Sequence, residues 1–276
     1  MAVPFNIDLK NKVVVVTGGS GVICSELCRA LDECNASVAI LDLNEQKAID
    51  LASGLKKAKG YGCNVLDKAQ LKEVHQRIIN DLGPVDILIN GAGGNNPKAT
   101  TDNEYASLND DGLKSFFDLD EEGFKFVFDL NMLGTFLPTQ EFAKDMIGKK
   151  GCSILNISSM NAFTPLTKIP AYSGAKASIS NFTKWLAVHF SKVGIRVNAI
   201  APGFFSTTQN KTLLWKEDGS PTARTEKILA ATPMGRFGEV NELVGATLFL
   251  LSEDVASFIT GVVLPIDGGF SSYSGV

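Results

Sequence analysis

The chain has 276 residues, of which 45% are hydrophobic and 20% are charged, and its formal net charge at pH 7 is −4. This apolar content suits a folded α/β chain with a sizeable core, and the acidic balance offers no basic footprint for nucleic acid or an anionic membrane, so we expect a small-molecule partner. No stretch is apolar enough to span a membrane and the amino-terminal residues lack a leader pattern, so we expect a cytoplasmic protein.

Short β-branched runs alternate with amphipathic stretches along the chain. Strands are expected over residues 13–16, 38–41, 87–89, 153–157 and 195–200, and helices over 20–34, 45–57, 68–82, 124–149, 171–193 and 240–251. This alternation predicts βαβ crossovers and a parallel sheet. Because the strand runs are continuously hydrophobic, helices are expected on both faces of the sheet. No linker divides the pattern, so residues 1–276 are predicted to form one doubly wound α/β domain.

Two stretches, 95–123 and 204–234, are longer than the connections that such folds prefer. The first contains Pro97 and is rich in acidic residues: Asp102, Glu104, Asp110, Asp111, Asp118, Glu121 and Glu122. One interpretation is a tolerated surface insertion. The other is a substrate pocket or lid, because both stretches follow strand ends on the side where open α/β sheets bind ligands.

A glycine-rich turn follows the first predicted strand, with the sequence Thr17-Gly18-Gly19-Ser20-Gly21-Val22-Ile23. Glycines at a strand-to-helix turn let the backbone approach a pyrophosphate, whose charge the helix amino terminus favours. Asp42 ends the second strand, 24 residues after Gly18, where a carboxylate accepts hydrogen bonds from an adenosine ribose. Its charge would repel a 2′-phosphate, so NAD is favoured over NADP, although Asp42 could instead be a helix-capping residue. The turn lacks the Gly-Lys-Ser/Thr of a nucleotide triphosphatase.

Tyr172 and Lys176 are four residues apart in a helical stretch, so both project from one face. An ammonium near the phenol stabilises the phenolate, which makes the pair a candidate proton donor and acceptor for a carbonyl and alcohol couple. Such a pair alone is usually an exposed helix contact. Here Ser159 precedes Tyr172 by 13 residues, at the end of a predicted strand, where its hydroxyl could bind the reacting oxygen.

These motifs together resemble the short-chain dehydrogenase/reductase family over nearly the whole chain. The matching segments are Thr17-Gly18-Gly19-Ser20-Gly21, Asp42, Asn90-Gly91-Ala92-Gly93, Asn131, Ser159, Tyr172 with Lys176, Pro202-Gly203 with Thr207, and Asp267-Gly268-Gly269. The resemblance implies a Rossmann-type domain with a mostly parallel seven-stranded sheet, an NAD-dependent oxidoreductase activity and a homo-oligomer, commonly a tetramer.

The resemblance also implies roles for individual residues. Tyr172 would be the general acid/base, Ser159 would orient the substrate carbonyl, Lys176 would lower the pKa of Tyr172 and hold the nicotinamide ribose, and Asn131 would anchor a water in the proton relay. Ser158 could act in place of Ser159, and Asn131 could merely cap or kink its helix. The implied cofactor contacts are Gly18, Ser20, Gly21, Val22, Asp42, Leu43, Asn64, Val65, Asn90, Gly91, Ala92, Tyr172, Lys176, Pro202, Gly203, Phe205 and Thr207.

The chain departs from the family pattern at two places. The family has a third glycine in its turn where this chain has Val22, Ile23 or Cys24, which puts close helix-to-strand packing in doubt. The Asp that precedes the valine after the third strand is Asn64 here, ahead of Val65, so an amide remains to meet the adenine but the charge is lost.

Longer segments allow a finer comparison within the family, namely residues 17–24, 93–101, 159–163, 165–170, 201–205 and 273–276. They resemble the D-mannonate oxidoreductases, or fructuronate reductases, of the short-chain type. That subgroup implies interconversion of D-fructuronate and D-mannonate, and a sugar acid needs cations for its carboxylate and polar groups for its hydroxyls. A gluconate 5-dehydrogenase or another polyol dehydrogenase is the alternative, and a catalytically silent nucleotide-binding regulator is an alternative of another class. Candidate substrate residues are Asn95, Lys98, Ser159, Asn161, Lys168 and Phe204.

No metal site is indicated. The five cysteines include no C-x-x-C pair, and the two histidines, His75 and His189, lie far apart in the sequence. Cys24 and Cys28 are one helical turn apart and are expected to be small buried residues on a helix face.

Overall fold

The computed structural model describes residues 6–107, 112–207 and 214–275. Within them, seven parallel strands form one sheet in the order β3-β2-β1-β4-β5-β6-β7. The strands are β1 (Val13–Thr17), β2 (Ser37–Asp42), β3 (Ala58–Gly62), β4 (Ile87–Asn90), β5 (Cys152–Ile157), β6 (Ile195–Pro202) and β7 (Val263–Ile266). The strand order reverses between β1 and β4. The predicted single doubly wound domain is confirmed, and the sheet, expected to be mostly parallel, has parallel pairing throughout.

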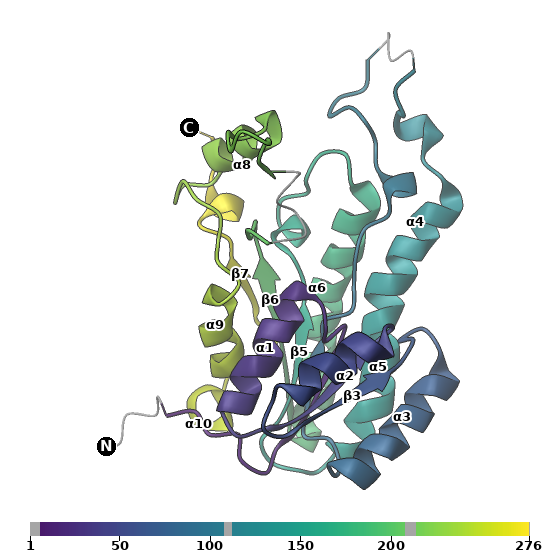
Figure 1. The fold of residues 1–276 in the computed structure, drawn as a ribbon, viewed down its shortest axis with the longest axis vertical. Helices are drawn as coiled ribbons and strands as arrows, with labels where there is room; N and C mark the ends of the chain where they lie inside the picture. The colour runs from purple at the N-terminus through teal and green to yellow at the C-terminus, as the bar shows by residue number, and fades with distance from the viewer. Residues whose placement is uncertain (1–5, 108–111, 208–213, 276) are drawn as a thin grey trace.

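Helices cover both faces of the sheet, as the continuous hydrophobic runs predicted (Figure 1). One buried cluster joins Val14 and Val16 of β1 to α1 (Val22–Glu33), α2 (Glu45–Ser53) and α9 (Glu242–Leu251). The other joins Val13 and Val15 to α3 (Lys68–Asp81), α5 (Gly134–Phe142) and α6 (Pro170–Phe190). Successive strand residues point to opposite faces, so a sheet buried on both sides needs apolar residues at every position.

The single helix predicted over 124–149 is wrong, because this stretch is divided. It consists of α4 (Glu121–Phe128), a π turn (Asp129–Leu133), α5 and a 3-10 turn (Ala143–Asp145). In the π turn, Asn131 Nδ2 donates to the carbonyl of Val127 at 2.7 Å. In a regular α-helix that carbonyl would accept from the backbone N–H of Asn131. π turns recur at functional sites, and this one displaces Asn131 from regular helical geometry.

Two strands carried no clear signal in the sequence. The glycines of β3 are typical of a turn. A Cβ on Gly60 would lie 2.3 Å from the backbone of Ala48 in α2, so the close contact between β3 and this helix requires glycine there. β7 contains Pro265, which disfavours a strand, but proline is tolerated at the edge of a sheet, where β7 lies. The short helices α8 (Ala223–Ala231) and α10 (Glu253–Ala256) were not predicted either.

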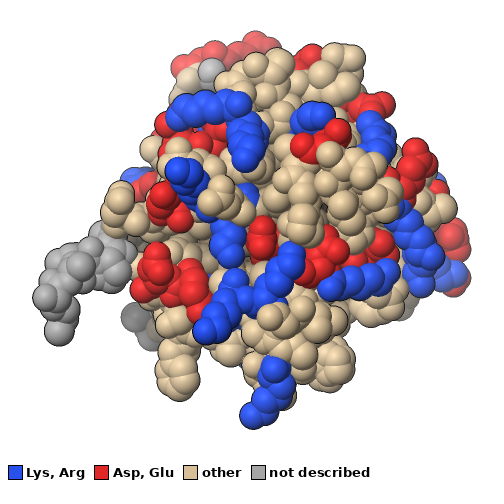
Figure 2. All heavy atoms as spheres, turned by 90° about the horizontal axis from the view of Figure 1, so that it is seen from below, with Lys and Arg blue, Asp and Glu red and all other residues tan. Residues whose placement is uncertain are grey.

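The described parts of the insertions 95–123 and 204–234 rise above the carboxyl ends of the strands (Figure 1). The first carries 3-10 turns at Pro97–Ala99 and Phe116–Asp118 before α4, and the second carries α8. Asp110 and Asp111, two of the acidic residues noted in the sequence, lie outside the described residues. The opposite end of the molecule, in Figure 2, shows basic and acidic side chains interspersed. None of the described helices combines the length and apolarity needed to cross a bilayer.

Candidate active site

The glycine turn lies between β1 and α1 and has the geometry of an anion site. Gly18 has a φ of +60°, which favours glycine, and a Cβ there would lie 2.9 Å from Cα of Ala92. Gly21 precedes α1 without a side-chain capping bond, and the first turn of α1, from Val22, carries no acidic residue. The amide groups at this helix end therefore meet no competing side-chain acceptor from the cap and can bind a phosphate oxygen.

Asp42 lies at the end of β2 beside the glycine turn. Its Oδ2 accepts a hydrogen bond from the backbone N–H of Ser20 at 3.2 Å, and its Oδ1 accepts one from Asn44 at 3.0 Å. The neighbouring Leu43 is 79% exposed. The carboxylate thus both caps the turn after β2 and holds the glycine turn against β2. The helix that follows is capped by Asn44, not by Asp42.

The segment after β4 is held against the same turn. Thr17 Oγ1 accepts hydrogen bonds from the backbone N–H groups of Gly91 at 3.1 Å and Ala92 at 3.3 Å. Thr17 is fully buried, and the sequence motif contained it, but its positioning role was not anticipated. Gly91 and Ala92, two predicted cofactor residues, therefore lie directly beside Gly18.

Two other predicted cofactor residues have side chains committed to the protein. Asn90 Nδ2 donates to Thr139 Oγ1 and to Asn156 Oδ1, both at 2.9 Å, inside the fold. Asn64 Oδ1 accepts from the N–H of Leu66 at 3.0 Å, and Val65 is buried. Asn90 would accordingly meet a cofactor through its backbone.

Cys24 occupies the region where the family has its third glycine. Its thiol is buried, and a Cβ added to Gly91 would lie 2.2 Å from Cys24 Sγ. A glycine in the helix usually permits close packing here. In this chain Gly91, in the segment after β4, permits the close contact with α1 instead. Cys24 and Cys28 are both buried free thiols on α1, as predicted. Burial raises the pKa of Cys24 to about 12, which makes it unreactive at neutral pH.

Ser159 and Tyr172 are brought together at the carboxyl edge of the sheet. Ser159 follows β5, is 7% exposed, and caps a 3-10 turn (Met160–Ala162) through Oγ, which accepts from the N–H of Asn161. Tyr172 lies in the first turn of α6, whose first residue, Pro170, has the φ that a helix start favours. The Ser159 hydroxyl is close enough to the Tyr172 phenol to influence its pKa.

Lys176 and Asn131 complete the same cluster around Gly93. A Cβ on Gly93 would lie 2.7 Å from Asn131 Oδ1 and 3.2 Å from Lys176 Nζ. Asn131 Nδ2 also donates to the carbonyl of Gly94 at 2.7 Å, and Lys176 Nζ donates to the carbonyl of Ile157 at 2.8 Å. Lys176 Nζ is 5.5 Å from the centre of the Tyr172 ring. The four residues predicted to be catalytic therefore share one site.

The charge states in this cluster differ from the sequence-based expectation in one respect. Burial raises the pKa of the Tyr172 phenol, and the influence of Ser159 only partly opposes this shift. Burial also lowers the pKa of Lys176 to about 8, against the influence of Cys24. The net shift of the Tyr172 pKa is therefore upward, whereas the family resemblance implied a lowering by Lys176.

Ser158, the alternative to Ser159, is engaged elsewhere. Its Oγ lies 2.7 Å from Ser180 Oγ and donates to the carbonyl of Lys176 at 3.2 Å. Its hydroxyl therefore ties β5 to α6. Ser159 has the better placement for contact with a substrate.

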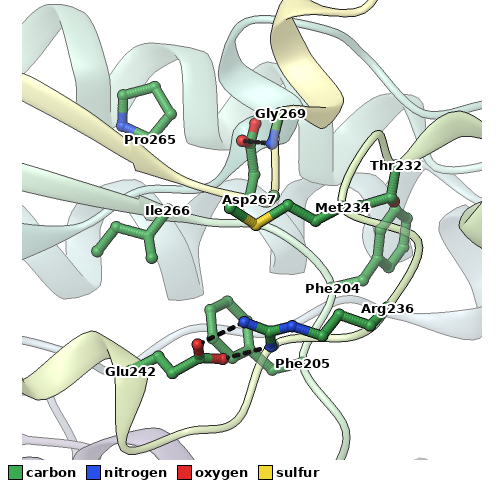
Figure 3. Close-up of a pocket in the computed structure, with 12 residues that line it drawn as sticks. Phe204, Phe205, Thr232, Met234, Arg236, Glu242, Pro265, Ile266, Asp267 and Gly269 are labelled. Atoms are coloured by element: carbon green, nitrogen blue, oxygen red, sulfur yellow. Dashed lines mark hydrogen bonds and ion pairs between the residues drawn. The ribbon is translucent and has the colours of Figure 1, made fainter.

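The predicted nicotinamide-side residues lie where β6 and β7 end. A Cβ on Gly203 would lie 2.6 Å from Asp267, so only glycine fits between the two strand ends. Beyond it lies a pocket of about 380 Å³ (Figure 3). It is lined by Phe204, Phe205, Thr232, Met234, Arg236, Gly238, Glu242, Pro265, Ile266, Asp267, Gly268 and Gly269.

Polar pairs fix the walls of this pocket. The Arg236 guanidinium forms two bonds with the Glu242 carboxylate, at 2.7 and 2.8 Å, and Asp267 Oδ1 accepts from the N–H of Gly269 (Figure 3). Pro202 is buried at the end of β6, and Thr207, half-buried, is the last described residue before the gap at 208–213. The sequence did not single out Arg236 or Glu242.

The candidate substrate residues are more dispersed. Asn161 is buried beside Ser159, and its Oδ1 has no hydrogen-bond partner in the structure. Lys168 Nζ donates to the carbonyl of Asp102 at 2.7 Å, and Asn95 Nδ2 donates to Thr100 Oγ1 at 3.0 Å. Lys98 is exposed, and Phe204 lines the pocket described above.

Comparison with known proteins agrees with this geometry. A Haemophilus influenzae protein named an uncharacterized oxidoreductase is 59% identical over 281 aligned residues, which cover 100% of this chain and 99% of that protein. The Bacillus subtilis uncharacterized oxidoreductase UxuB is 48% identical over 99% of this chain and 100% of its own length. A Haemophilus influenzae crystal structure with bound NAD, provisionally assigned as a D-mannonate oxidoreductase, is 59% identical, covers 100% of both chains and superposes with a TM-score of 0.95. Residues 12–218 match the short chain dehydrogenase family. The chain therefore belongs to the short-chain dehydrogenase/reductase family, as its motifs predicted.

Proposed function

We propose that the chain is an NAD-dependent oxidoreductase that interconverts D-fructuronate and D-mannonate. The gathering of Ser159, Tyr172, Lys176 and Asn131 around Gly93 carries the reaction type. The sugar-acid substrate is supported by 59% identity over the whole chain to the protein provisionally assigned as a D-mannonate oxidoreductase. That the enzyme is an NAD-dependent dehydrogenase acting on CH–OH groups follows from its family and from the NAD in that relative.

The residues present fit a dinucleotide. Gly18, Gly91 and the amino end of α1 leave backbone close to where a pyrophosphate would lie, and Asp42 offers a carboxylate at the end of β2 for the adenosine ribose. A 2′-phosphate at that place would meet the Asp42 charge, which disfavours NADP. Gly203, Phe205 and Thr207 would hold the nicotinamide end.

Tyr172 would act as the proton donor in the reduction of the ketone. The bound cofactor supplies the hydride. Burial raises the pKa of Tyr172, so the phenol is protonated at neutral pH and can donate to the carbonyl oxygen. Ser159, which lies in the same cluster, would donate to the same oxygen and fix its position.

Lys176 and Asn131 would support this proton transfer. With a pKa of about 8, Lys176 is mostly protonated at pH 7 and can donate to a ribose hydroxyl as well as to the Ile157 carbonyl. Asn131, held in the π turn by Val127 and Gly94, would anchor a water that reloads Tyr172.

The two insertions would frame the substrate pocket, and the enzyme would work as a homotetramer. Large apolar side chains are exposed on α4 and α6: Phe124, Phe126, Trp185 and Val188. Helix faces of this kind suit association between copies of the chain. Because its cosubstrate belongs to the intracellular NAD pool, we expect the enzyme to act in the cytoplasm.

Turnover of NADH with a series of keto-acids tests the proposed substrate. Purified protein is offered D-fructuronate, 5-keto-D-gluconate and 2-keto-D-gluconate separately, and NADH oxidation is followed by absorbance. Turnover with D-fructuronate at least tenfold faster than with either rival supports the proposal. Preference for 5-keto-D-gluconate would instead identify a gluconate 5-dehydrogenase, and no turnover despite NADH binding would reject both.

A further inference from the structure

A second pocket, of about 400 Å³, opens between α8 and the segment that precedes α6. Three cationic side chains line it, Lys168, Arg224 and Lys227, whereas Glu104 is the one carboxylate among its lining residues. The pocket therefore carries an excess of positive charge in a chain whose net charge is −4. Phe204 and Phe270, whose rings meet edge to face at 5.3 Å, supply an apolar wall.

Arg224 and Lys227 are three residues apart on α8 and so share one face of that helix. The helix is anchored near both ends, because Thr225 Oγ1 donates to the carbonyl of Leu214 at 2.6 Å and Met234 N donates to the carbonyl of Gly268 at 3.1 Å. Lys227 Nζ meets Glu104 Oε1 at 2.7 Å, which joins α8 to the other insertion. The two cations are thus presented by a fixed helix.

Arg224 is the cation whose charge is least compensated. It is exposed, and within residues 6–107, 112–207 and 214–275 no carboxylate forms an ion pair with it. A guanidinium has paired donors that match the two oxygens of a carboxylate. Its position in the pocket lining makes it available to an anionic ligand.

Lys168 contributes its charge from the opposite wall. Its backbone φ of +72° is unusual for a side-chain-bearing residue, and its carbonyl accepts from the N–H of Thr101 at 2.9 Å. Its ammonium donates to the Asp102 carbonyl, a neutral acceptor, so its charge remains unpaired by that bond. The hydrogen bond from Lys227 and then the charge of Lys168 hold the pKa of Glu104 down, although desolvation opposes them, so both cations influence this pocket.

We propose that Arg224 and Lys227, assisted by Lys168, bind the carboxylate of the sugar acid while its ketone end faces Tyr172. Phe204 lines both this pocket and the pocket beyond Gly203, and Lys168 precedes Tyr172 of the catalytic cluster by four residues in the chain. The ketone and the carboxylate of a hexulosonate lie near opposite ends of its chain, which fits two separate subsites. This assignment rests on the proposed sugar-acid function and names the residues that select it.

Ligand binding by charge variants tests the carboxylate subsite. D-Mannonate and D-mannitol, which has a hydroxymethyl group in place of the carboxylate, are titrated calorimetrically into the enzyme–NADH complex. The wild-type complex is expected to bind D-mannonate at least tenfold more tightly than D-mannitol. Arg224→Gln and Lys227→Gln are each expected to weaken D-mannonate binding about tenfold, as for a charge-assisted hydrogen bond on an exposed pair, and to leave D-mannitol binding unchanged.

Arg29→Gln is the matched control, because Arg29 is exposed on α1, outside the pocket lining. Unchanged D-mannonate binding in both pocket variants, equal losses for both ligands, or a wild-type complex that binds D-mannonate no better than D-mannitol would overturn the subsite. NAD reduction with D-mannonate, measured on the same wild-type protein, decides the proposed function separately. If D-mannonate binding depends on Arg224 but no NAD is reduced, the carboxylate subsite is supported and the proposed reaction is rejected.

Discussion

The cofactor side of the molecule and its two insertions are built by different means. Around the glycine turn, backbone meets backbone, because Gly18 lies against Ala92 and Gly91 lies against the Thr17 carbonyl, with no room for a Cβ. The insertions meet through long side chains in the Lys227–Glu104 ion pair, and Lys168, in the segment before α6, donates to the Asp102 carbonyl of the first insertion. Backbone contacts tolerate few substitutions, whereas exposed ion pairs contribute at most about 1 kcal/mol each.

This difference separates the common part of the reaction from the specific part. The backbone-built side can hold a pyrophosphate, a group shared by every dinucleotide. The side-chain-built insertions can change charge and shape at small cost in stability, which suits the selection of a substrate. Tyr172 and Ser159 lie at the border between the two.

The largest predicted effect is at this border. Tyr172→Phe removes the proton donor but keeps the ring, so kcat is expected to fall about a thousandfold. Stopped-flow and steady-state assays of D-fructuronate reduction measure this loss, and NADH fluorescence measures cofactor binding. Retained binding with lost turnover supports catalysis by Tyr172, whereas retained turnover would contradict it and the enzyme assignment of this cluster.

Gly18→Ala tests the backbone-built side. The residue has a φ of +60°, and the new Cβ would lie 2.9 Å from Cα of Ala92, so the turn must shift. We expect NADH binding to weaken by at least tenfold and unfolding stability to fall by about 2 kcal/mol. Gly54→Ala is the control, since φ there is −89° and the nearest atom is 3.7 Å away. Equal behaviour of the two variants would show that close approach at Gly18 is unimportant.

Asp42→Ser tests which nucleotide the backbone-built side accepts. Loss of the carboxylate removes the repulsion of a 2′-phosphate and the bond to Ser20, so the ratio of kcat/KM for NADP to that for NAD is expected to rise about tenfold. Steady-state kinetics with both cofactors measure this ratio. Asp50→Asn, on the exposed face of α2, should leave it unchanged. An unaltered ratio in Asp42→Ser would show that Asp42 caps the turn but does not select between NAD and NADP.

The same contrast explains how far the sequence could be interpreted. Gly18 and Asp42 lie at a fixed spacing within one strand–helix–strand unit, and Tyr172 and Lys176 lie one helix turn apart, so local patterns identified them. Arg224 and Lys227 lie on α8, a nine-residue helix, and come to Lys168 only through folding. No spacing in the sequence indicates such a meeting.

Fold details were missed for related reasons. The π turn at Asn131 depends on a side chain that bonds to Val127 and Gly94, and the latter belongs to a distant segment. β3 was hidden by Gly60, which is explained only by its contact with α2. In both places a tertiary contact overrides local propensity.

The smallest predicted effect concerns a buried cluster outside both regions. His75 lies on α3 between two carboxylates. Its Nδ1 is 2.9 Å from Glu141 Oε1, and its Nε2 is 2.9 Å from Asp145 Oδ2. Both ring nitrogens are therefore within hydrogen-bonding distance of a carboxylate. Although desolvation opposes it, hydrogen bonds from Lys144 and His75 lower the pKa of Glu141 below its usual 4.5.

Because the folded-state pKa of Glu141 is lowered, its stabilising contribution is present above pH 4.5 and is lost as the pH falls through the folded value. Glu141→Gln is therefore expected to lower the free energy of unfolding by about 1 kcal/mol at pH 7, and by less as the pH falls below 4.5. Urea denaturation of the wild type and the variant across this range measures the difference, with Glu73→Gln on the exposed face of α3 as the control. A deficit that stays constant down to the lowest pH at which both proteins fold would show that the lost contact is one of packing, and that the charge of Glu141 does not stabilise the junction between α3 and α5.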